Sequence, residues 1–331
     1  MQQGRATLTL RYRRLAMGSA RTAIPLLTMA AAIATVSGCT DRQTVTAPRQ
    51  SALSARADRH VSSTFTSFDP PGSGLTLATD INAPGQIVGR YLNAGKTHGF
   101  LREPDGTITT IDYPGAGFTV AGSINDSGAI AGWYTLPAAP AIRHGFLLQD
   151  GVFTSFDPPG STFTNALGIN ERGDIVGRFR PTGNGDFHGF IYRNGEFTTL
   201  DVPGATETDA FKLQANDAVV GGFNQSGVEG LFVYSKGEFT TFTLPNGKNV
   251  TLDNGGVNAR GDIVGTYCDL PGICAIGPFQ THGFLWSNGD LTSIDYPGAR
   301  ATAATGINER GDITGGYIDA NGHPSGFLLR R

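Results

Sequence analysis

The sequence carries little charge and few lysines. Charged residues make up 16% of its 331 residues, against roughly 25% in ordinary domains. It contains four lysines, and its formal net charge is -3. Binding to nucleic acid needs a basic surface that neutralises phosphates, so we expect no nucleic-acid partner. Hydrophobic residues reach 39%, which is enough to bury a core and excludes a broadly disordered chain.

Motifs that carry chemistry are also scarce. The chain has three cysteines and two tryptophans, and it lacks a His-x-x-x-His pair, a nucleophile elbow and a phosphate-binding loop. The absence of a Trp-Asp pair argues against WD40-type repeats. We therefore predict no catalytic residue, no metal and no cofactor, and an enzyme is the less favoured interpretation.

An apolar run near the N-terminus, at 23–34, is shorter than the roughly 20 residues that a membrane span needs. Five arginines precede or flank it, and it leads to Val36-Ser37-Gly38-Cys39. A basic start, a short apolar run and a small-residue ending are typical of an export signal. The ending resembles the bacterial lipobox, which implies that lipid is attached to the sulfur of Cys39 and that the chain is cut before it.

We therefore expect a lipoprotein signal peptide over 1–38 and a lipid anchor with a flexible tether over 39–62. By analogy with Gram-negative sorting, Thr40 after the cysteine favours the outer membrane, with lipid as the sole membrane attachment. Two alternatives stay open: an ordinary signal peptide with a chance cysteine, and a start at Met17 in place of Met1.

Glycine is abundant, with 47 residues, and much of it marks repeats. Gly-x-Ile-Val-Gly or a close variant occurs at 85–89, 128–132, 173–177, 261–265 and 311–315, with a degenerate copy ending at Gly221. Successive copies lie 43 to 50 residues apart. His-Gly-Phe and Asp-x-Pro-Gly recur with the same period. A period near 44 that holds four strand-like segments is typical of a propeller blade.

The third repeat predicts strands at 164–170, 174–179, 188–193 and 196–201, with Asn and Gly in the hairpin turns. A lone fourth-type strand stands at 64–69, and the last repeat ends after its third strand. The strand at 64–69 would supply the fourth strand that the last repeat lacks. We predict an all-β, six-bladed β-propeller of four-stranded antiparallel blades over 63–331, closed by the N-terminal strand. One segment, Phe153-Thr154-Ser155-Phe156, fits neither strand alternation nor a helix.

These repeats resemble bacterial proteins of the HAF family of probable extracellular repeats. The family is named for His-Ala-Phe, so Gly99, Gly145, Gly189 and Gly283 depart from it. The resemblance covers nearly all of 64–331. It implies an exported protein with propeller-like repeats and no particular activity.

Candidate ligand-binding residues fall at the end of the second strand and after the fourth. The residue inside Gly-x-Tyr/Phe varies between repeats, and Arg90, Trp133 and Arg178 suit anionic or sugar ligands, although ordinary surface variation is the favoured alternative. Five aspartates recur after the fourth strand: Asp69, Asp112, Asp157, Asp201 and Asp295. They would form a ring for a cation or a polyol, but repetition favours a structural role in turns. Repetition also favours a structural role for His98, His144, His188 and His282.

The variable loops between second and third strands share a face with these aspartates, so we expect the site there. The longest of these loops contains Cys268 and Cys274, for which export favours a disulfide over a metal site. The leading hypothesis is a monomeric, membrane-anchored binding module of the cell envelope, for a glycan or an envelope protein. The alternatives are a glycan hydrolase or lyase at the channel mouth, and a structural envelope protein.

Overall fold

The computed structural model describes residues 64–183, 185–242, 249–268 and 281–331, and they form β-strands and turns. Cys39 and the segments 1–38 and 39–62 lie outside the described residues. Within the described part, no helix is long and apolar enough to span a bilayer. The described residues are all-β, as predicted from the repeats.

Four consecutive strands form each of the first five antiparallel units. The first two units are β2 (Leu75–Ile81), β3 (Ile87–Asn93), β4 (Lys96–Arg102) and β5 (Ile108–Ile111), then β6 (Phe118–Ile124), β7 (Ile130–Leu136), β8 (Ala139–Gln149) and β9 (Val152–Phe156). The next two are β10 (Ser161–Ile169), β11 (Ile175–Pro181), β12 (His188–Arg193) and β13 (Glu196–Leu200), then β14 (Glu207–Leu213), β15 (Val219–Gln225), β16 (Val228–Ser235) and β17 (Glu238–Phe242).

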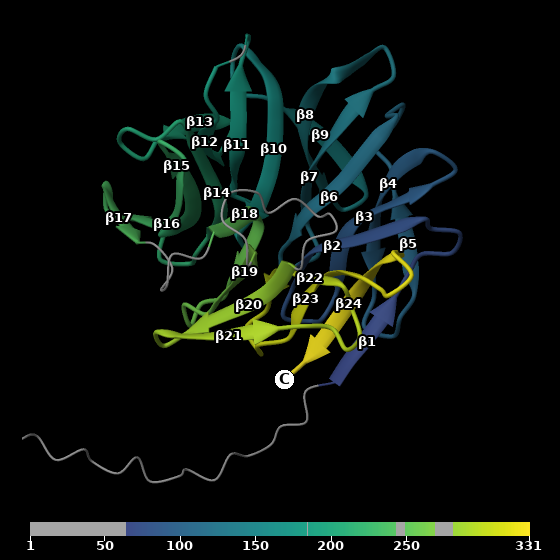
Figure 1. Ribbon diagram of the computed structural model, residues 1–331. Coiled ribbons are helices and arrows are strands. Elements are labelled where there is room, and N and C mark those ends of the chain that lie inside the picture. Colours follow the sequence, from purple (N-terminus) through teal and green to yellow (C-terminus); the bar gives the residue numbers. More distant parts are fainter. Residues whose placement is uncertain (1–63, 184, 243–248, 269–280) are drawn as a thin grey trace, which may run out of the picture. The chain divides into compact units, whose positions relative to one another are not determined.

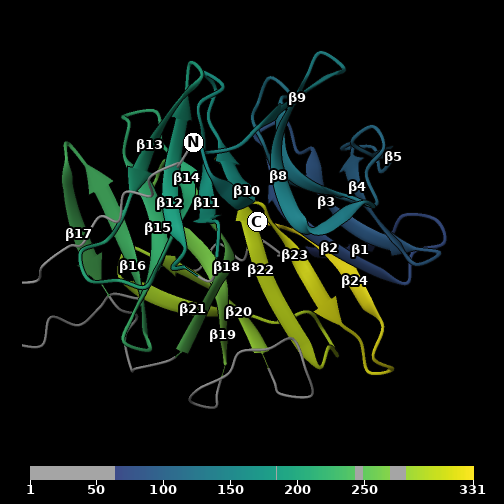
Figure 2. The ribbon, with the colours of Figure 1, turned by 90° about the horizontal axis from the view of Figure 1, so that it is seen from above.

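The fifth unit follows the same order, and the last takes its fourth strand from the other end of the described residues. The fifth is β18 (Asn249–Val257), β19 (Ile263–Cys268), β20 (Thr281–Ser287) and β21 (Asp290–Ile294). The last is β22 (Ala301–Ile307), β23 (Ile313–Ile318) and β24 (Pro324–Arg330), with β1 (Thr64–Phe68) as its fourth strand. β1 pairs antiparallel with β24, from Thr64 opposite Arg330 to Phe68 opposite Gly326. Figures 1 and 2 show the two strands side by side.

The first strands of neighbouring units pack against one another. β6 contacts β2 and β10, β14 contacts β10 and β18, and β22 contacts β18 and β2. The first three units also join edge to edge through single parallel pairs, Thr97 with Phe118 and Arg143 with Phe163. Figure 1 shows the units arranged around a common centre.

The core lies between neighbouring units. Six phenylalanines, one at the same place in the third strand of each unit, are fully buried: Phe100, Phe146, Phe190, Phe232, Phe284 and Phe327. A glycine on the adjoining strand leaves room for each ring. A Cβ at Gly89, for example, would lie 2.7 Å from the Phe100 ring and 2.2 Å from the carbonyl oxygen of Leu77. The repeated glycine and phenylalanine are thus two halves of one packing contact.

The predicted strands of the third repeat match the structure within a few residues. The third strand is found as predicted at His188–Arg193, and the first begins earlier, at Ser161. The puzzling segment Phe153–Phe156 belongs to the outermost strand of its unit. Phe153 packs on Tyr113 of the preceding unit, whereas Phe156 stacks on Tyr192 of the following one. A spacing of three places the two rings on opposite faces of the strand, with exposed Thr154 and Ser155 between them.

Candidate functional site

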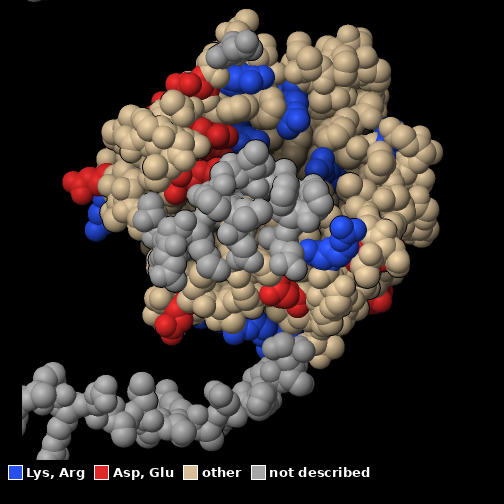
Figure 3. Space-filling view, viewed as in Figure 1, with Lys and Arg blue, Asp and Glu red and all other residues tan. Residues whose placement is uncertain are grey.

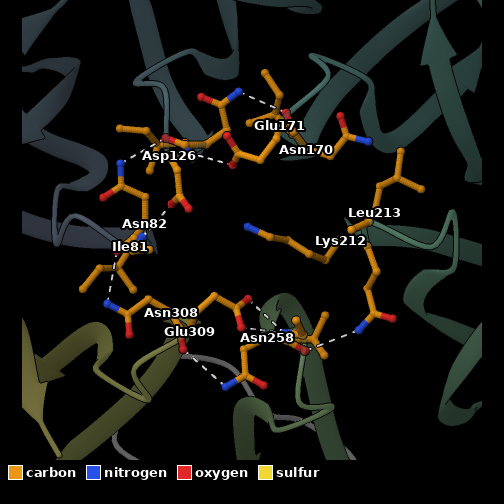
Figure 4. A pocket seen from close by; sticks show the side chains of 18 of the residues that line it. Ile81, Asn82, Asp126, Asn170, Glu171, Lys212, Leu213, Asn258, Asn308 and Glu309 are labelled. Carbon is orange, nitrogen blue, oxygen red and sulfur yellow. Dashed lines mark hydrogen bonds between the residues drawn. The ribbon is translucent and has the colours of Figure 1, made fainter.

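A cavity of about 420 Å³ lies where the turns between first and second strands converge. Equivalent turn residues of the units line it, from Ile81-Asn82-Ala83 in the first to Ile307-Asn308-Glu309 in the last. Figure 4 shows these side chains surrounding an open centre. Because strands alternate in direction, the cavity lies at the end of the molecule opposite the variable loops. The sequence predicted the site at those loops. The cavity therefore identifies a second candidate face.

The cavity wall is a belt of side-chain amides. An amide nitrogen of one unit donates to a turn carbonyl of the next: Asn82 to Asn125 and Asn125 to Asn170 at 3.0 Å, Gln214 to Asn258 and Asn258 to Asn308 at 3.3 Å, and Asn308 to Asn82 at 3.1 Å. The same asparagines accept hydrogen bonds within their own turns, as the Asn-x-x-Gly pattern predicted; Asn82 Oδ1 accepts from the backbone N–H of Gln86 at 2.8 Å. The hydrogen bonds of these amides therefore stabilise the turns and join neighbouring units.

Three exposed carboxylates stand at the rim of the cavity. Asp126, Glu171 and Glu309 each accept a backbone N–H from the preceding unit, at 2.7, 2.8 and 2.9 Å. Each carboxylate has a second oxygen with further acceptor capacity. The rim is therefore acidic, and part of each carboxylate is committed to joining two units.

The floor of the cavity breaks the repeat. Lys212 on β14 reaches across the centre to Asp80 on β2, with 3.2 Å between Nζ and Oδ2. Asp80 Oδ2 also accepts from Ser123 Oγ at 2.5 Å and from the backbone N–H of Ile124 at 3.2 Å. The Asp80 side chain is 9% exposed and that of Lys212 is 24% exposed. Figure 4 shows Lys212 pointing into the middle of the cavity.

Glycine occupies the matching position in the other units, at Gly168, Gly256 and Gly306. These glycines are required by close approach of the backbones. A Cβ at Gly306 would lie 2.8 Å from the Cα of Asp80, and one at Gly168 would lie 2.3 Å from the carbonyl oxygen of Phe211. The centre is thus narrow below the cavity, and Asp80, Ser123 and Lys212 are the polar side chains at this level. Their departure from the glycine pattern is the sequence signal that would have identified them.

The turns beside the rim hold a second charged motif, Asn-x-Arg-Gly-Asp. In one copy, Asp174 accepts from Asn170 Nδ2 and from Arg172 Nε, both at 3.0 Å. Burial raises the pKa of Asp174, but these hydrogen bonds and the charge of Arg193 outweigh it, so the pKa lies below its ordinary value. The carboxylate is therefore a fixed anion that stabilises the turn.

The repeated histidines and aspartates pair with each other inside each unit. Nδ1 of the histidine lies near the aspartate: 2.9 Å for His98 and Asp112, 2.6 Å for His144 and Asp157, 2.9 Å for His188 and Asp201, and 2.7 Å for His282 and Asp295. Each histidine also packs on an aromatic ring of the second strand, as His98 does on Tyr91. Asp69, which follows β1, is exposed, and a serine, Ser325, takes the place of its histidine.

The variable residues of Gly-x-Tyr/Phe lie on three different units and do not meet in the central cavity. Trp133 on β7 is 6% exposed. Arg178 on β11 bonds Glu207 at 3.0 Å and Asp209 at 2.9 Å, both on β14 of the next unit. Arg90 on β3 is half-buried opposite Leu77. Cys268 is buried at the end of β19, and Cys274 lies outside the described residues, so their disulfide stays a prediction.

Comparison with known proteins shows similarity in fold. A putative gluconolactonase superposes with a TM-score of 0.51 at 10% identity, over 82% of this chain and 92% of that one. The β-propeller domain of the Trilobed protease from Pyrococcus furiosus gives a TM-score of 0.49 at 12% identity, over 76% and 81% of the two chains. Virginiamycin B lyase from Staphylococcus aureus gives 0.42 at 14%, over 80% and 88%.

The fold is a β-propeller. Identities this low carry the fold and no activity. No protein-family model matches the sequence, and the comparison with curated proteins gives no match.

Proposed function

We propose that this chain is an exported lipoprotein, anchored through Cys39, whose six-bladed β-propeller binds a small polar ligand at its centre. Pairing of β1 with β24 and contact of β22 with β2 support a closed ring of six blades. The basic start, the apolar run and the lipobox-like ending support export and lipidation.

One observation carries the binding function: a single lysine projects into a cavity built otherwise from equivalent turns. A scaffold requirement repeats in every unit, whereas Lys212 does not. The volume of about 420 Å³ lies in the range of small-molecule sites, roughly 300–1,000 Å³. An ammonium below a rim of carboxylates suits a ligand with both hydrogen-bond acceptors and donors, such as a hydroxylated or zwitterionic molecule.

Binding is tested with the full-length lipidated chain in detergent. A library of sugars, amino acids and polyols is screened by thermal shift, and hits are measured by calorimetry. We expect Lys212→Met to weaken a hit at least about tenfold, the loss of one charged hydrogen bond. Lys96→Met, at a lysine paired with Asp112 away from the cavity, serves as the matched control.

Removing Lys212 leaves the buried Asp80 carboxylate without its cationic partner, so the double variant Lys212→Met/Asp80→Asn is measured as well. In this double variant both side chains of the floor are uncharged and similar in size to the native ones. It therefore separates a loss of ligand binding from a loss of folding caused by an unpaired buried charge. Hits that bind both variants and the native chain equally would remove the central cavity from the proposal.

The alternative, a glycan hydrolase or lyase, has the rim carboxylates in its favour. Asp126, Glu171 and Glu309 face one cavity, and paired carboxylates are the usual groups for glycoside hydrolysis. Turnover of a glycan that is abolished by Glu171→Gln or Glu309→Gln would establish this function over simple binding.

Lipidation has its own test. In a Gram-negative host, labelled fatty acid should be incorporated into the native chain and not into Cys39→Ser. Export of unlipidated native protein would contradict the anchor and leave the binding function untouched.

A further inference from the structure

Three arginines converge on one aromatic ring at the junction of the second and third units. The guanidinium carbon of Arg143, on β8, lies 4.4 Å from the ring centroid of Phe163, on β10. Those of Arg178 and Arg180, on β11, lie at 5.7 and 5.6 Å. Strand register imposes this arrangement, because Phe163 pairs with Arg180 across one edge of β10 and with Arg143 across the other.

A second ring extends the cluster. Phe187, which precedes β12, packs edge-to-face on Phe163 with 5.0 Å between centroids. Arg178 and Arg180 lie 4.9 and 5.0 Å from the Phe187 centroid. The two rings hold the guanidinium groups by cation–π contact, which is stronger for Arg than for Lys because of its planar, weakly hydrated head group. The side chains are thereby held in place before any ligand arrives.

Two carboxylates offset the charge of Arg178, whereas Arg180 is not paired in this way among the described residues. Glu207 and Asp209 both bond to Nη1 of Arg178. Arg180 forms no ion pair within the part of the chain that the structure describes, and its buried Nε has no hydrogen-bond partner there. Aromatic faces attract the guanidinium of Arg180 but do not neutralise its charge. A bound anion would do so.

The cluster lies at the end of the molecule opposite the central cavity. Phe187 ends the connection between β11 and β12 and bridges to Glu207 at the start of β14, so the variable loops border it. Figure 3 shows Lys and Arg side chains gathered beside a hollow over the region of β7 to β11. This is the face where loop variation predicted function, and carboxylates lie on it beside the arginines.

We infer that Arg143, Arg178 and Arg180 form an oxyanion site that takes the carboxylate or phosphate of an acidic saccharide. The planar fork of a guanidinium matches both groups and donates two parallel hydrogen bonds to them. Neutral sugars offer no charge to the cluster. Arginines contact both phenylalanine rings, so the rings already take part in cation–π contacts.

The site is tested by calorimetry with the full-length chain at low salt, using trigalacturonate, neutral galactotriose and inorganic phosphate. We expect trigalacturonate to bind at least about tenfold more tightly than galactotriose, and salt to weaken it. Inorganic phosphate should compete with it, since both present oxyanions to the same donors.

Arg143→Gln and Arg180→Gln should each weaken trigalacturonate about tenfold without lowering the melting temperature. Arg178 is left intact because its ion pairs join two units. Arg300→Gln changes an exposed arginine on the same side and is the matched control, expected to bind as the native chain does.

Equal affinity for the acidic and neutral trisaccharides, or unchanged affinity in both arginine variants, would overturn the oxyanion site. Neither result bears on the proposal for the central cavity, because binding there is tested separately with Lys212→Met. Conversely, loss of cavity binding in Lys212→Met with trigalacturonate affinity unchanged would show that the two sites are separate.

Discussion

Asn308 donates its side-chain N–H to the backbone carbonyl of Asn82 at 3.1 Å, although the two residues are 226 positions apart. The bond joins the turn between β22 and β23 to the turn between β2 and β3. It repeats the contact by which Asn82 reaches Asn125, and the two asparagines are 3% and 4% exposed. The first and last units are therefore held by the same interaction as sequential neighbours.

Asn308→Ala should lower the free energy of unfolding by about 2 kcal/mol, because it removes the bond to Asn82 and the acceptor of the backbone N–H groups of Arg310 and Asp312. Urea denaturation followed by fluorescence measures the loss. Asn321→Ala, at an exposed turn position, is the control and should stay within about 0.5 kcal/mol of the native chain. Equal effects of the two substitutions would show that the amide belt contributes nothing special.

A second prediction concerns β1. No hairpin connects this strand to β24, so side-chain packing must help to hold it in place. Phe65 packs edge-to-face on Tyr296 and Phe327, with centroid separations of 5.2 and 5.5 Å. Phe239 occupies the same place in the unit β14–β17, where a tight hairpin at Lys236 and Gly237 tethers its strand to β16.

Phe65→Ala and Phe239→Ala should each cost about 2 kcal/mol, since both rings are half-buried. The first alone should release its strand, because no hairpin ties β1 to β24. Limited proteolysis under native conditions measures this release as faster cleavage near residue 68. Similar cleavage rates in both variants would argue against β1 as a separately held strand.

Much of this fold is predictable from turn chemistry. Asn-x-x-Gly and Asn-Gly mark hairpins because Asn bonds its own turn and Gly accepts positive φ, as Gly173 does at 82°. These markers recur with a fixed period, so the strand edges follow. Phe153 and Phe156 were unexplained because alternation assumes one buried face. An outer strand instead buries one ring against each neighbouring unit.

The centre of the molecule is less predictable from the sequence. Each first strand carries an irregularity just before its turn, between Ala78 and Asp80 in β2 and between Ala210 and Lys212 in β14. An inserted residue shifts all later side chains to the other face, so alternation counted along the strand misplaces Asp80 and Lys212. Their meeting across 132 positions depends on the arrangement of units, which no local pattern encodes.

The histidine–aspartate pairs predict a structural effect of modest size. Asp157→Asn should cost about 1 kcal/mol, because His144 and Asp157 are partly exposed, at 26% and 30%. Ligand affinity at either proposed site should not change. Asp290→Asn, at an exposed strand end, is the matched control for stability. A loss of ligand affinity in Asp157→Asn would instead assign the aspartates to a binding surface.

Cys268 and Cys274 should be joined in protein recovered from the envelope. Mass spectrometry after alkylation under denaturing conditions is expected to find neither thiol free. Closing so short a loop contributes about 2 kcal/mol by chain entropy, so reduction should lower the melting temperature. Alkylation of both cysteines without prior reduction would disprove the disulfide.

Ionisation of Tyr134 should make the free energy of unfolding depend on pH in the alkaline range. Its ring stacks on Tyr113 with 3.6 Å between centroids, and its hydroxyl lies 3.0 Å from Ser155 Oγ. Burial raises the pKa of Tyr134 from 10.0 to about 12; the bond to Ser155 opposes the shift and Tyr113 adds to it. Between these values the unfolded chain releases a proton that the folded chain retains, so folding weakens as pH rises.

The contribution of Tyr134 is therefore complete below about pH 10 and is lost as pH rises to about 12. The difference amounts to about 2 kcal/mol near the upper end of this range. Urea denaturation at pH 8 and pH 11.5 compares the native chain with Tyr134→Phe. The variant starts lower at pH 8, because it lacks the bond to Ser155, but it should lose less stability on going to pH 11.5. Parallel losses in the two proteins would show that the Tyr134 phenol ionises alike in the folded and unfolded chain.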